Sequence, residues 1–534
     1  HDSSAVLDEL RVAIDPKHGT YRPIDWHVDF KSGYRWNQRT WAMDIRYGHL
    51  HGVDIKVPWE LSRAHHLAVL GIYALTTDQI KTVANEVSLE LLDWITANPP
   101  RFGVNWRSAM DVAIRAVNWI WVLTLFDGRK AIPVAVQWLV TKSLYQHALH
   151  IESNLDNLET YTTNHYLADV IGLMYIAFSF PQFPRSDKWL AFCLRELVNE
   201  MKKTVYPDGV NYEGATGYHR LVTEMFLHGT LLAIRLKQDR RKHIGYYLRG
   251  YGENTVDIHI DQSEVLPDWY YSRLRRMVNY VADTTKPNGL APQFGDHDSG
   301  RLIKFTPKLT RDGRSDHREE PRNHSHIVST GRAIFGERFW LPTDAESDSE
   351  ALTLCFGIKS LPLSTCNDRD PTSYPMRLSH PSRTQLGDSI WYPEGGTCIL
   401  RKDLIWVAIR CGPMGTGPGG HRHNDQLSFE LNVNGQDIVV DWGTGAYTPD
   451  FDLRNRLRST FSHSTLAPQG VEQNSIPSGR FGLFALLDQT NPQVLEFSQD
   501  RFVGQHSGFK SPHIRGFEIG SHKLTIDDTL NLIG

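Results

Sequence analysis

Three residues near the C-terminal end of the chain combine types and spacing that suit a divalent metal. His423 precedes a run in which apolar residues alternate, and Asn434-Gly435 predicts a two-residue hairpin turn, because both positions of such a turn need positive φ. The returning strand brings Asp441 back beside His423, and His463 follows 22 residues later. Two imidazoles and a carboxylate form a ligand set that suits zinc best. We therefore predict one divalent ion, zinc, held by these three residues.

His421 lies two residues before His423, so both side chains point the same way in an extended segment. Because the ligand set does not need His421, this imidazole is a candidate for proton transfer. Histidine-rich loops also occur simply at strand ends, and that interpretation stays open for the two histidines taken alone. The further aspartate and histidine favour the metal.

Size and composition indicate a globular protein of two domains. The chain has 534 residues, which exceeds one ordinary core, with 40% hydrophobic and 22% charged residues. The net charge of −4 gives no global basic field for nucleic acid or membrane binding, so an anionic substrate needs a locally basic cleft. The 15 Trp and 20 Tyr residues are numerous, and such rings commonly stack on sugars, although most must belong to the core and its rim.

Several classes of protein are disfavoured. The most apolar stretch, Trp119–Phe126, is only eight residues, and no uninterrupted apolar run is long enough to span a membrane. The five cysteines are odd in number and form no CxxC pair, which argues against a disulfide scaffold or a cysteine metal site, although one disulfide stays open. The chain begins with His1 rather than Met, so we expect the natural start to be missing.

The apolar period divides the chain into two halves. Helical periodicity from about Trp59 to Ile358 predicts a toroid or solenoid over 1–360. A segment rich in Pro, Ser and Asp predicts a linker at 361–381. Period-two patterns predict an antiparallel β-sandwich over 382–534, which we expect to be truncated at its C-terminal end. The predicted helices are 59–77, 78–97, 108–126, 130–149, 161–180, 185–205, 217–236, 264–284, 325–337 and 349–358. The predicted strands are 396–400, 404–411, 427–433, 438–440, 481–487, 494–497 and 523–527.

Three motifs occur in one order: Asn164-His165-Tyr-Leu-Ala-Asp169, then Asp208 to His219 (DGVNYEGATGYH), then the His421-x-His423 hairpin. With Asn105-Trp106 and Trp59-Glu60-Leu-Ser-Arg63, the chain resembles the heparinase II/III-like polysaccharide lyases over most of its length. The resemblance implies an N-terminal (α/α) toroid, a C-terminal antiparallel β-sandwich and a cleft between them. It further implies β-elimination on a polysaccharide that contains uronic acid.

The resemblance also assigns roles. Asn164 matches the asparagine that neutralises the uronate carboxylate, and His165 lies where many members have an active-site histidine. Tyr218 matches the catalytic tyrosine and His421 the catalytic histidine of the sandwich, while His423, Asp441 and His463 match the metal ligands. The expected substrate-binding residues are Arg63, Asn105, Trp106, Glu213 and His219. Where the family often has Pro after the strand aspartate, this chain has Trp442, which puts the local subsite in doubt.

The reaction needs a group that stabilises charge on the carboxyl group, a base at C5 and an acid at the leaving O4. Tyr218 serves as an acid without help, but as a base only beside groups that favour phenolate. In glucuronate C5–H and O4 share a face, so Tyr218 alone could shuttle the proton. The C5 epimer, iduronate, needs a base on the other face, for which we expect His421.

Structural interpretations stand beside these roles. Asn164 could simply cap a helix, Tyr218 could be an ordinary helical residue, and Glu213 could orient its loop or cap the helix that begins near Gly217. Asp296-His297-Asp298 looks like a metal cluster, but a turn with aspartate side-chain bonds is the favoured interpretation.

The predicted function is a lyase that acts on a glycosaminoglycan such as heparan sulfate, chondroitin or hyaluronan. A lyase of the same architecture for alginate or a bacterial exopolysaccharide is the alternative. A metal-dependent carbohydrate hydrolase or binding protein is the second alternative, although no opposed pair of carboxylates for a glycoside hydrolase stands out. The expected partner is an anionic uronate polysaccharide, with no nucleic acid and no membrane insertion. A periplasmic or secreted location is favoured. The sequence does not indicate which oligomeric state the protein adopts.

Overall fold

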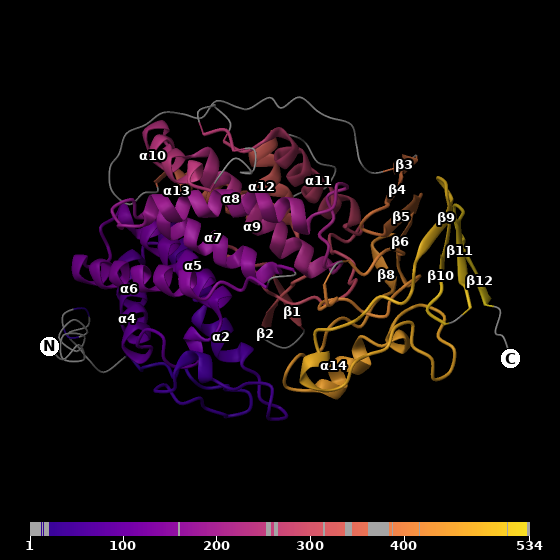
Figure 1. Cartoon of the computed structure of the whole chain (residues 1–534), viewed down its shortest axis with the longest axis horizontal. Coiled ribbons are helices and arrows are strands. Elements are labelled where there is room, and N and C mark those ends of the chain that lie inside the picture. Colours follow the sequence, from indigo (N-terminus) through magenta and orange to yellow (C-terminus); the bar gives the residue numbers. More distant parts are fainter. Residues whose placement is uncertain are drawn as a thin grey trace.

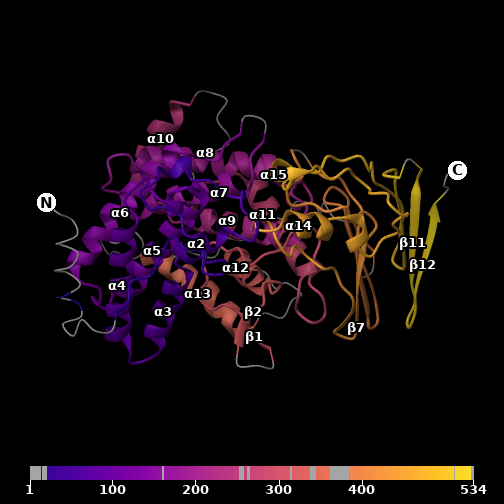
Figure 2. The same cartoon turned by 90° about the horizontal axis from the view of Figure 1, so that it is seen from below.

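A computed structural model describes residues 12, 14, 21–158, 161–251, 258–260, 265–312, 316–336, 344–360, 384–386, 388–415, 417–509 and 511–530. Within them, a helical half is followed by a half built from β-sheets (Figure 1). The view from below shows the same division along the long axis (Figure 2). The predicted fold class, an (α/α) toroid followed by an antiparallel β-sandwich, is confirmed.

The helical half consists of helices of up to 20 residues joined mostly by short loops. Its helices are α2 (Lys56–Ser62), α3 (His65–Thr76), α4 (Ile80–Ala97), α5 (Ala109–Asp127), α6 (Val134–Ser153), α7 (Asn164–Ser179), α8 (Ser186–Thr204), α9 (Thr216–Ile234), α10 (Gln238–Arg249), α11 (Asp268–Thr284), α12 (Ser325–Phe335) and α13 (Ala345–Ser360). A hairpin of β1 (Leu309–Asp312) and β2 (Asp316–Glu319) lies among them.

Helices α3, α5, α7 and α9 pack against one another in that order and form the inner row, while α4, α6 and α8 pack outside their chain neighbours. Nearly every residue of α5, α7 and α9 is buried, as expected for helices that are apolar on all sides. Helix α5 is long and apolar enough to cross a membrane, but 89% of that stretch is buried inside the fold. Its composition is therefore that of a core helix.

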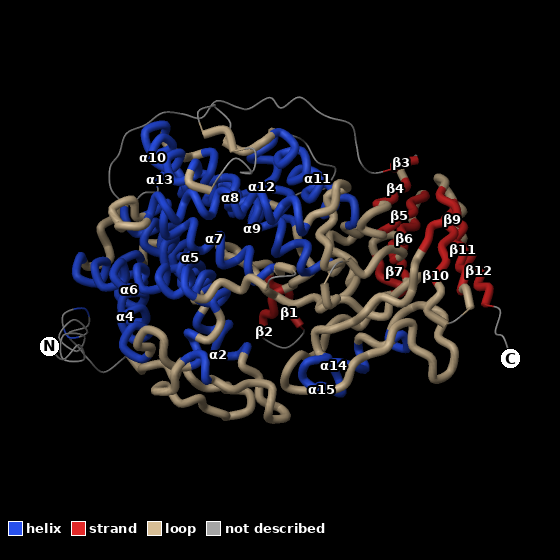
Figure 3. Tube along the Cα trace, in the orientation of Figure 1, coloured by secondary structure: helices blue, strands red, loops and turns tan. Residues whose placement is uncertain are grey.

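The second half contains two antiparallel sheets that pack face to face, as the red strands in Figure 3 show. Their shared core includes Val407 and Ile409 from one sheet and Phe502 and Phe517 from the other. The larger sheet has the order β3 (Thr384–Leu386), β4 (Ser389–Tyr392), β5 (Thr397–Lys402), β6 (Ile405–Arg410), β7 (Phe429–Val433) and β8 (Gln436–Val439). The smaller has the order β12 (Leu524–Leu530), β11 (His513–Ile519), β10 (Arg501–His506) and β9 (Gln493–Phe497). Between β8 and β9 lie α14 (Phe451–Leu457), a 3₁₀ turn (Thr460–Ser462) and α15 (Gly479–Gly482).

The hairpin that carries the candidate metal ligands forms as predicted. Asn434 and Gly435 both have positive φ, 52° and 79°, and join β7 to β8. A register shift between Leu431 and Asn432 marks a bulge beside the turn. Among the described residues, Cys193, Cys398 and Cys411 are free thiols, and Cys366 lies outside those residues.

Two predicted elements are wrong in informative ways. The helix expected over 59–77 breaks at Ala64, whose φ is 61°, so that α2 and α3 are separate helices. The strand expected over 481–487 is α15 followed by a loop. There the Arg458 guanidinium donates to the carbonyl oxygens of Gly482, Leu483 and Ala485, which a neighbouring strand would otherwise bond. Helices α10 and α14 and strands β1, β2, β3, β4, β10 and β11 were not predicted.

Buried ion pairs and hydrogen bonds join the two halves. Lys286, which follows α11, lies 3.0 Å from Glu430 on β7 and 2.9 Å from Asp437 on β8. Asp208 accepts hydrogen bonds from the backbone N–H groups of Glu394 and Gly395, at 2.9 and 2.8 Å. The predicted linker 361–381 lies outside the described residues, and the domain limits 1–360 and 382–534 stay predictions.

Candidate active site between the toroid and the sandwich

Tyr218 and His421 meet where the two halves join. Tyr218 belongs to the first turn of α9, and His421 lies in the sandwich loop that leads to β7. Their rings are nearly parallel, 15° apart, with centroids separated by 3.5 Å. The Tyr218 hydroxyl lies 3.2 Å from an Asp298 carboxylate oxygen and 3.1 Å from the Tyr447 hydroxyl. The site therefore takes side chains from the toroid and from the sandwich.

The environment of Tyr218 favours the protonated phenol. Burial raises its pKa well above the ordinary value, and the neighbouring Asp298 carboxylate raises it further. Asp298 itself is held as a carboxylate by Lys56, whose ammonium group lies 2.8 Å away and also 4.6 Å from the centre of the Tyr447 ring. Tyr218 is thus built to donate a proton rather than to accept one.

Asp296 fixes the tautomer of His421. The His421 Nδ1 atom lies 2.9 Å from an Asp296 oxygen, and because a carboxylate only accepts, Nδ1 carries the hydrogen. The lone pair of the neutral ring is then on Nε2, which lies 3.7 Å from Glu213. Burial alone would raise the pKa of Asp296, but the Arg454 guanidinium and the two bonded imidazoles hold it well below its ordinary range. This aspartate–histidine pair leaves Nε2 free to accept a proton.

Asn164 begins α7 on the toroid side of the site. Thr163 is the N-cap of this helix, because its hydroxyl accepts from the His165 N–H at 3.3 Å. The Glu213 carboxylate accepts from the Asn164 backbone N–H at 3.0 Å and from its side-chain amide at 3.1 Å. Glu213 therefore binds the start of α7 rather than the start of α9, and it holds the Asn164 amide. The buried Asn164 Oδ1 has no hydrogen-bond partner.

His165 extends this group toward solvent. Its Nδ1 atom lies 3.2 Å from Asp156, and its side chain is 45% exposed. Burial works against its charge, but the hydrogen bond to Asp156 raises its pKa, with smaller contributions from Asp111 and Glu213. This places beside Asn164 a partly exposed imidazole whose protonated form is favoured by Asp156.

Other predicted substrate-binding residues are occupied with partners inside the toroid. The Arg63 guanidinium, only 6% exposed, bonds Asp111 and Glu60, each at 2.6 Å. Trp106 is completely buried and donates to a backbone oxygen at 3.2 Å. His219 is 2% exposed, and both of its ring nitrogens bond the backbone.

Asn105 is 1% exposed and donates to Asn98 and to the Trp26 carbonyl, both at 2.8 Å. As the toroid stands, Asn105, Trp106 and His219 are packing residues without a surface that a sugar could touch. Arg63 positions Asp111 behind the site.

The candidate metal ligands do converge. One side-chain atom from each of His423, Asp441 and His463 lies within 4.8 Å of the other two. His463 Nδ1 lies 2.6 Å from Asp441, and the two imidazole rings are 5.2 Å apart. The buried His423 Nδ1 and His463 Nε2 atoms have no hydrogen-bond partner. Unpartnered buried imidazole nitrogens beside a carboxylate fit a divalent metal.

Asp296 connects this triad to His421. One of its oxygens bonds His421, and the other lies 2.9 Å from His423 Nε2. A carboxylate bonded to the outer nitrogen of a ligand histidine is a common device for orienting that ligand. The interpretation of residues 296–298 as only a turn was therefore incomplete. Asp298 does make the expected turn bond, to the Gly300 N–H at 2.8 Å, but both aspartates also hold the site.

Three further site residues had no signal in the sequence: Lys56, Tyr447 and Arg454. Each reaches the site from a segment without a recognisable motif. Arg454 is fully buried, bonds both oxygens of Asp296 and lies over the Tyr447 ring at 5.2 Å. A search for aromatic or basic residues in the segment after β8 would have found Tyr447 and Arg454 only among many others, and Lys56 lies elsewhere, at the start of α2.

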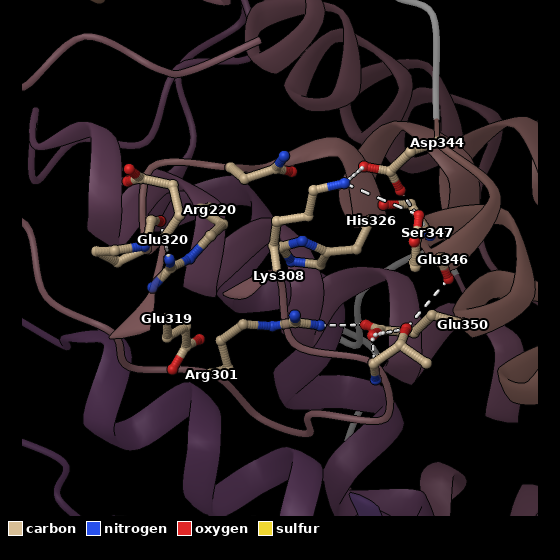
Figure 4. Close-up of a pocket in the computed structure, with 13 residues that line it drawn as sticks. Arg220, Arg301, Lys308, Glu319, Glu320, His326, Asp344, Glu346, Ser347 and Glu350 are labelled. Atoms are coloured by element: carbon tan, nitrogen blue, oxygen red, sulfur yellow. Dashed lines mark hydrogen bonds and ion pairs between the residues drawn. The ribbon is translucent and has the colours of Figure 1, made fainter. Parts of the chain in front are cut away.

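A small polar cavity is lined by charged side chains, among them Arg220, Arg301, Lys308 and Glu350 (Figure 4). The Arg220 guanidinium lines it and donates to the Asp298 carbonyl oxygen at 3.1 Å. Across the cavity Arg301 pairs with Glu350. The free space is about 20 Å³, which suits one water molecule and no sugar. Arg220, which lines this cavity, supports the loop of Asp298, and the cavity itself is too small to be a substrate site.

Comparison with known proteins gives matches along most of the chain. Residues 17–248 match the family model described as heparinase II/III N-terminus, and residues 384–532 match heparinase II/III-like, C-terminal. A heparin-sulfate lyase of Pedobacter heparinus is 24% identical over 472 residues. That alignment covers 84% of this chain but 58% of the relative, so the chain spans less than two thirds of the relative's length.

Solved structures share the fold. A crystal structure of heparinase III aligns with a TM-score of 0.55 and 15% identity, over 98% of this chain and 70% of that one. Another heparinase III gene product aligns with a TM-score of 0.51 and 18% identity, over 99% of this chain and 74% of that one. At these identities the likeness concerns the arrangement of toroid and sandwich.

Proposed function

The chain belongs to the heparinase II/III-like family, and from that premise we propose that it is a polysaccharide lyase. It cleaves a polysaccharide that contains uronic acid by β-elimination, removing the C5 hydrogen and releasing O4. The observation that carries the proposal is the stacked pair of Tyr218 and His421, each with a partner suited to one proton transfer.

In this mechanism His421 is the base and Tyr218 the acid. The His421 Nε2 lone pair accepts the C5 proton while Asp296 stabilises the imidazolium that forms. The Tyr218 phenol, protonated because of burial and Asp298, gives its proton to the leaving O4. The C5–H and C4–O4 bonds break and a C4=C5 double bond forms, so no water is consumed. Tyr447, 3.1 Å from the Tyr218 oxygen, can donate a hydrogen bond to the phenolate left behind.

The stacking of the two rings supports a proposal about which face of the sugar reacts. With centroids 3.5 Å apart, the two rings leave no space for a sugar between them, so both approach the substrate from one side. This differs from the expectation that His421 approaches from the face opposite Tyr218. Because C5–H and O4 share a face in glucuronate, the arrangement favours glucuronate over its C5 epimer.

Asn164 supplies the carboxylate stabilisation. Charge builds on the uronate carboxyl group as the C5 proton leaves, and an amide donor that is already oriented lowers the barrier. Glu213 holds the Asn164 amide in place, and the neighbouring His165 has a pKa that Asp156 raises.

We assign zinc to His423, Asp441 and His463, on the basis of their donor set and the unpartnered nitrogens. When bound, the ion fixes the three ligand segments together. Through Asp296 these ligands hold the loop of His421 in position, and the proton transfers need no step at the metal.

The substrate class that we propose is a glycosaminoglycan, such as heparan sulfate, chondroitin or hyaluronan. A relative that acts on heparin sulfate supports this choice. The test is incubation of the protein with each of these polymers and with alginate, followed by near-ultraviolet absorbance of the new C4=C5 bond. Absorbance from a glycosaminoglycan is the expected result, whereas cleavage of alginate alone would replace the substrate class. Reducing ends without absorbance would mean hydrolysis and would exclude a lyase.

A further inference from the structure

Two exposed aromatic rings flank the candidate metal triad. Trp442 follows Asp441 directly and is 77% exposed, more than any other aromatic side chain of the described residues. Phe461 precedes His463 by two residues and is 53% exposed. Because Asp441 and His463 lie 2.6 Å apart, both rings are carried by segments that are tied together at one point of the surface.

The backbone that carries Trp442 is held on both sides. The Gly443 N–H donates to the Asp441 side chain at 2.9 Å, and the Gln293 amide lies 3.3 Å from the Asp441 carbonyl oxygen. Gly443 has a φ of +72°, and a Cβ atom there would lie 2.7 Å from Gln293. The exposed Trp442 indole is thus carried by a loop whose backbone is held in place. A fixed loop loses less conformational entropy when a ligand binds to the indole.

The same loop leads into the catalytic group. Tyr447, five residues after Trp442, has its hydroxyl 3.1 Å from that of Tyr218. Five residues span at most about 17 Å when fully extended, so the Trp442 backbone lies no farther than this from the Tyr447 backbone. A polymer that runs from the site along this loop would have chain within reach of Trp442.

We propose that Trp442 and Phe461 form an accessory subsite that stacks on a pyranose ring of the polysaccharide, away from the bond that is cleaved. The inference rests on the proposed lyase function and extends it. The C–H face of a pyranose ring is apolar, and an exposed indole is the side chain that best covers such a face. Binding energy gained away from the reacting centre improves turnover of long chains and leaves short substrates unaffected.

The experiment compares Trp442→Ala with Trp138→Ala. Trp138 is also strongly exposed, at 62%, but lies on the toroid helix α6 and serves as the matched control. We expect Trp442→Ala to lower kcat/KM on a long glycosaminoglycan about tenfold, as loss of one stacking contact would. The same variant should cleave the shortest accepted oligosaccharide at the wild-type rate, and Trp138→Ala should change neither activity. Phe461→Ala should shift the polymer value in the same direction as Trp442→Ala.

Equal kcat/KM on the polymer for wild type and Trp442→Ala would overturn the subsite while leaving the lyase function intact. If the wild type cleaves no polymer, the proposed function fails. The subsite proposal is then tested on its own by measuring how tightly the protein binds each polymer. Affinity electrophoresis through gels that contain each polymer then compares the wild type with Trp442→Ala, and equal retardation overturns the subsite. Sedimentation gives the remaining outcome: if Trp442→Ala only dissociates an oligomer, the rings are a contact between copies of this chain.

Discussion

The imidazole of His421 lies flat against the phenol ring of Tyr218, with 3.5 Å between the ring centroids. The two residues are 203 positions apart and belong to different domains. Their partners, Asp296 for the imidazole and Asp298 for the phenol, come from one short loop of the toroid. One loop therefore supplies a carboxylate partner to both groups, and neither the toroid nor the sandwich alone contains the site.

Replacement of Asp296 by Asn should separate tautomer control from packing. The change keeps the shape, but the amide can donate to His421 Nδ1 and thereby stabilise the wrong tautomer. We expect activity to fall about 10²–10⁴-fold, in line with such changes in other aspartate–histidine pairs. Stability should also fall by about 3–5 kcal/mol, because Arg454 stays buried without its carboxylate. Steady-state kinetics and urea unfolding measure the two effects, and wild-type activity in a folded variant would contradict the assigned base.

Removal of the Asn164 side chain should affect every substrate alike. Each substrate develops charge on the same carboxyl group, so Asn164→Ala should lower kcat about 10²–10³-fold on each polymer that the wild type cleaves. Glu213→Gln keeps an acceptor for the α7 N-terminus but loses its charge, so a smaller decrease is expected. A loss confined to one polymer would show that Asn164 reads substrate identity instead.

Removal of the metal should loosen the sandwich. His423, Asp441 and His463 come from three separate segments, so their shared ion adds stability to the folded state. We expect metal analysis to give one zinc per chain and chelation to lower Tm by at least about 5 °C. Asp441→Asn is the matched control, because its Tm should already be low and should respond little to chelator. Purified protein without stoichiometric metal, whose Tm chelator leaves unchanged, would refute the site.

Asp208 makes the domain interface sensitive to pH. Burial raises its pKa to about 6, against about 3.9 in an unfolded chain. The folded state therefore binds the Asp208 proton more tightly than the unfolded chain does. The resulting contribution to the free energy of unfolding is fully present below about pH 4 and is lost as the pH rises through 6. The loss amounts to roughly 3 kcal/mol. In urea unfolding between pH 4 and 7, Asp208→Asn should lack this component of the decline, whereas parallel curves for both proteins would rule it out.

Local patterns predicted the large elements well. The sequence identified the core helices α5, α7 and α9 by two signals. One was helical periodicity. The other was a recognisable helix end, such as the Ser108 N-cap of α5, which remains visible even when a helix is buried on all sides. The hairpin at Asn434-Gly435 was predictable because its turn requires positive φ. The strand expected over 481–487 was wrong because Arg458, from a separate segment, bonds its carbonyl groups.

The candidate site was predictable only where motifs carry it. Residues of the matched motifs, among them Tyr218, His421 and the metal triad, do converge. Tyr447 was missed because its contact with Tyr218 joins residues 229 positions apart, and no local pattern marks such a pair. Trp106 was misjudged because an aromatic side chain in a motif fits a sugar cleft or a core equally well, and here it is buried.

The central claim is that Tyr218 gives its proton to the leaving oxygen of a uronate polymer. The most direct measurement is the near-ultraviolet absorbance produced from a glucuronate-containing glycosaminoglycan by wild type and by Tyr218→Phe. The phenylalanine keeps the ring against His421 and removes only the hydroxyl. We predict a loss of at least about 10²–10⁴-fold in kcat with little change in Tm. Near-wild-type turnover by a well-folded Tyr218→Phe protein would contradict the account.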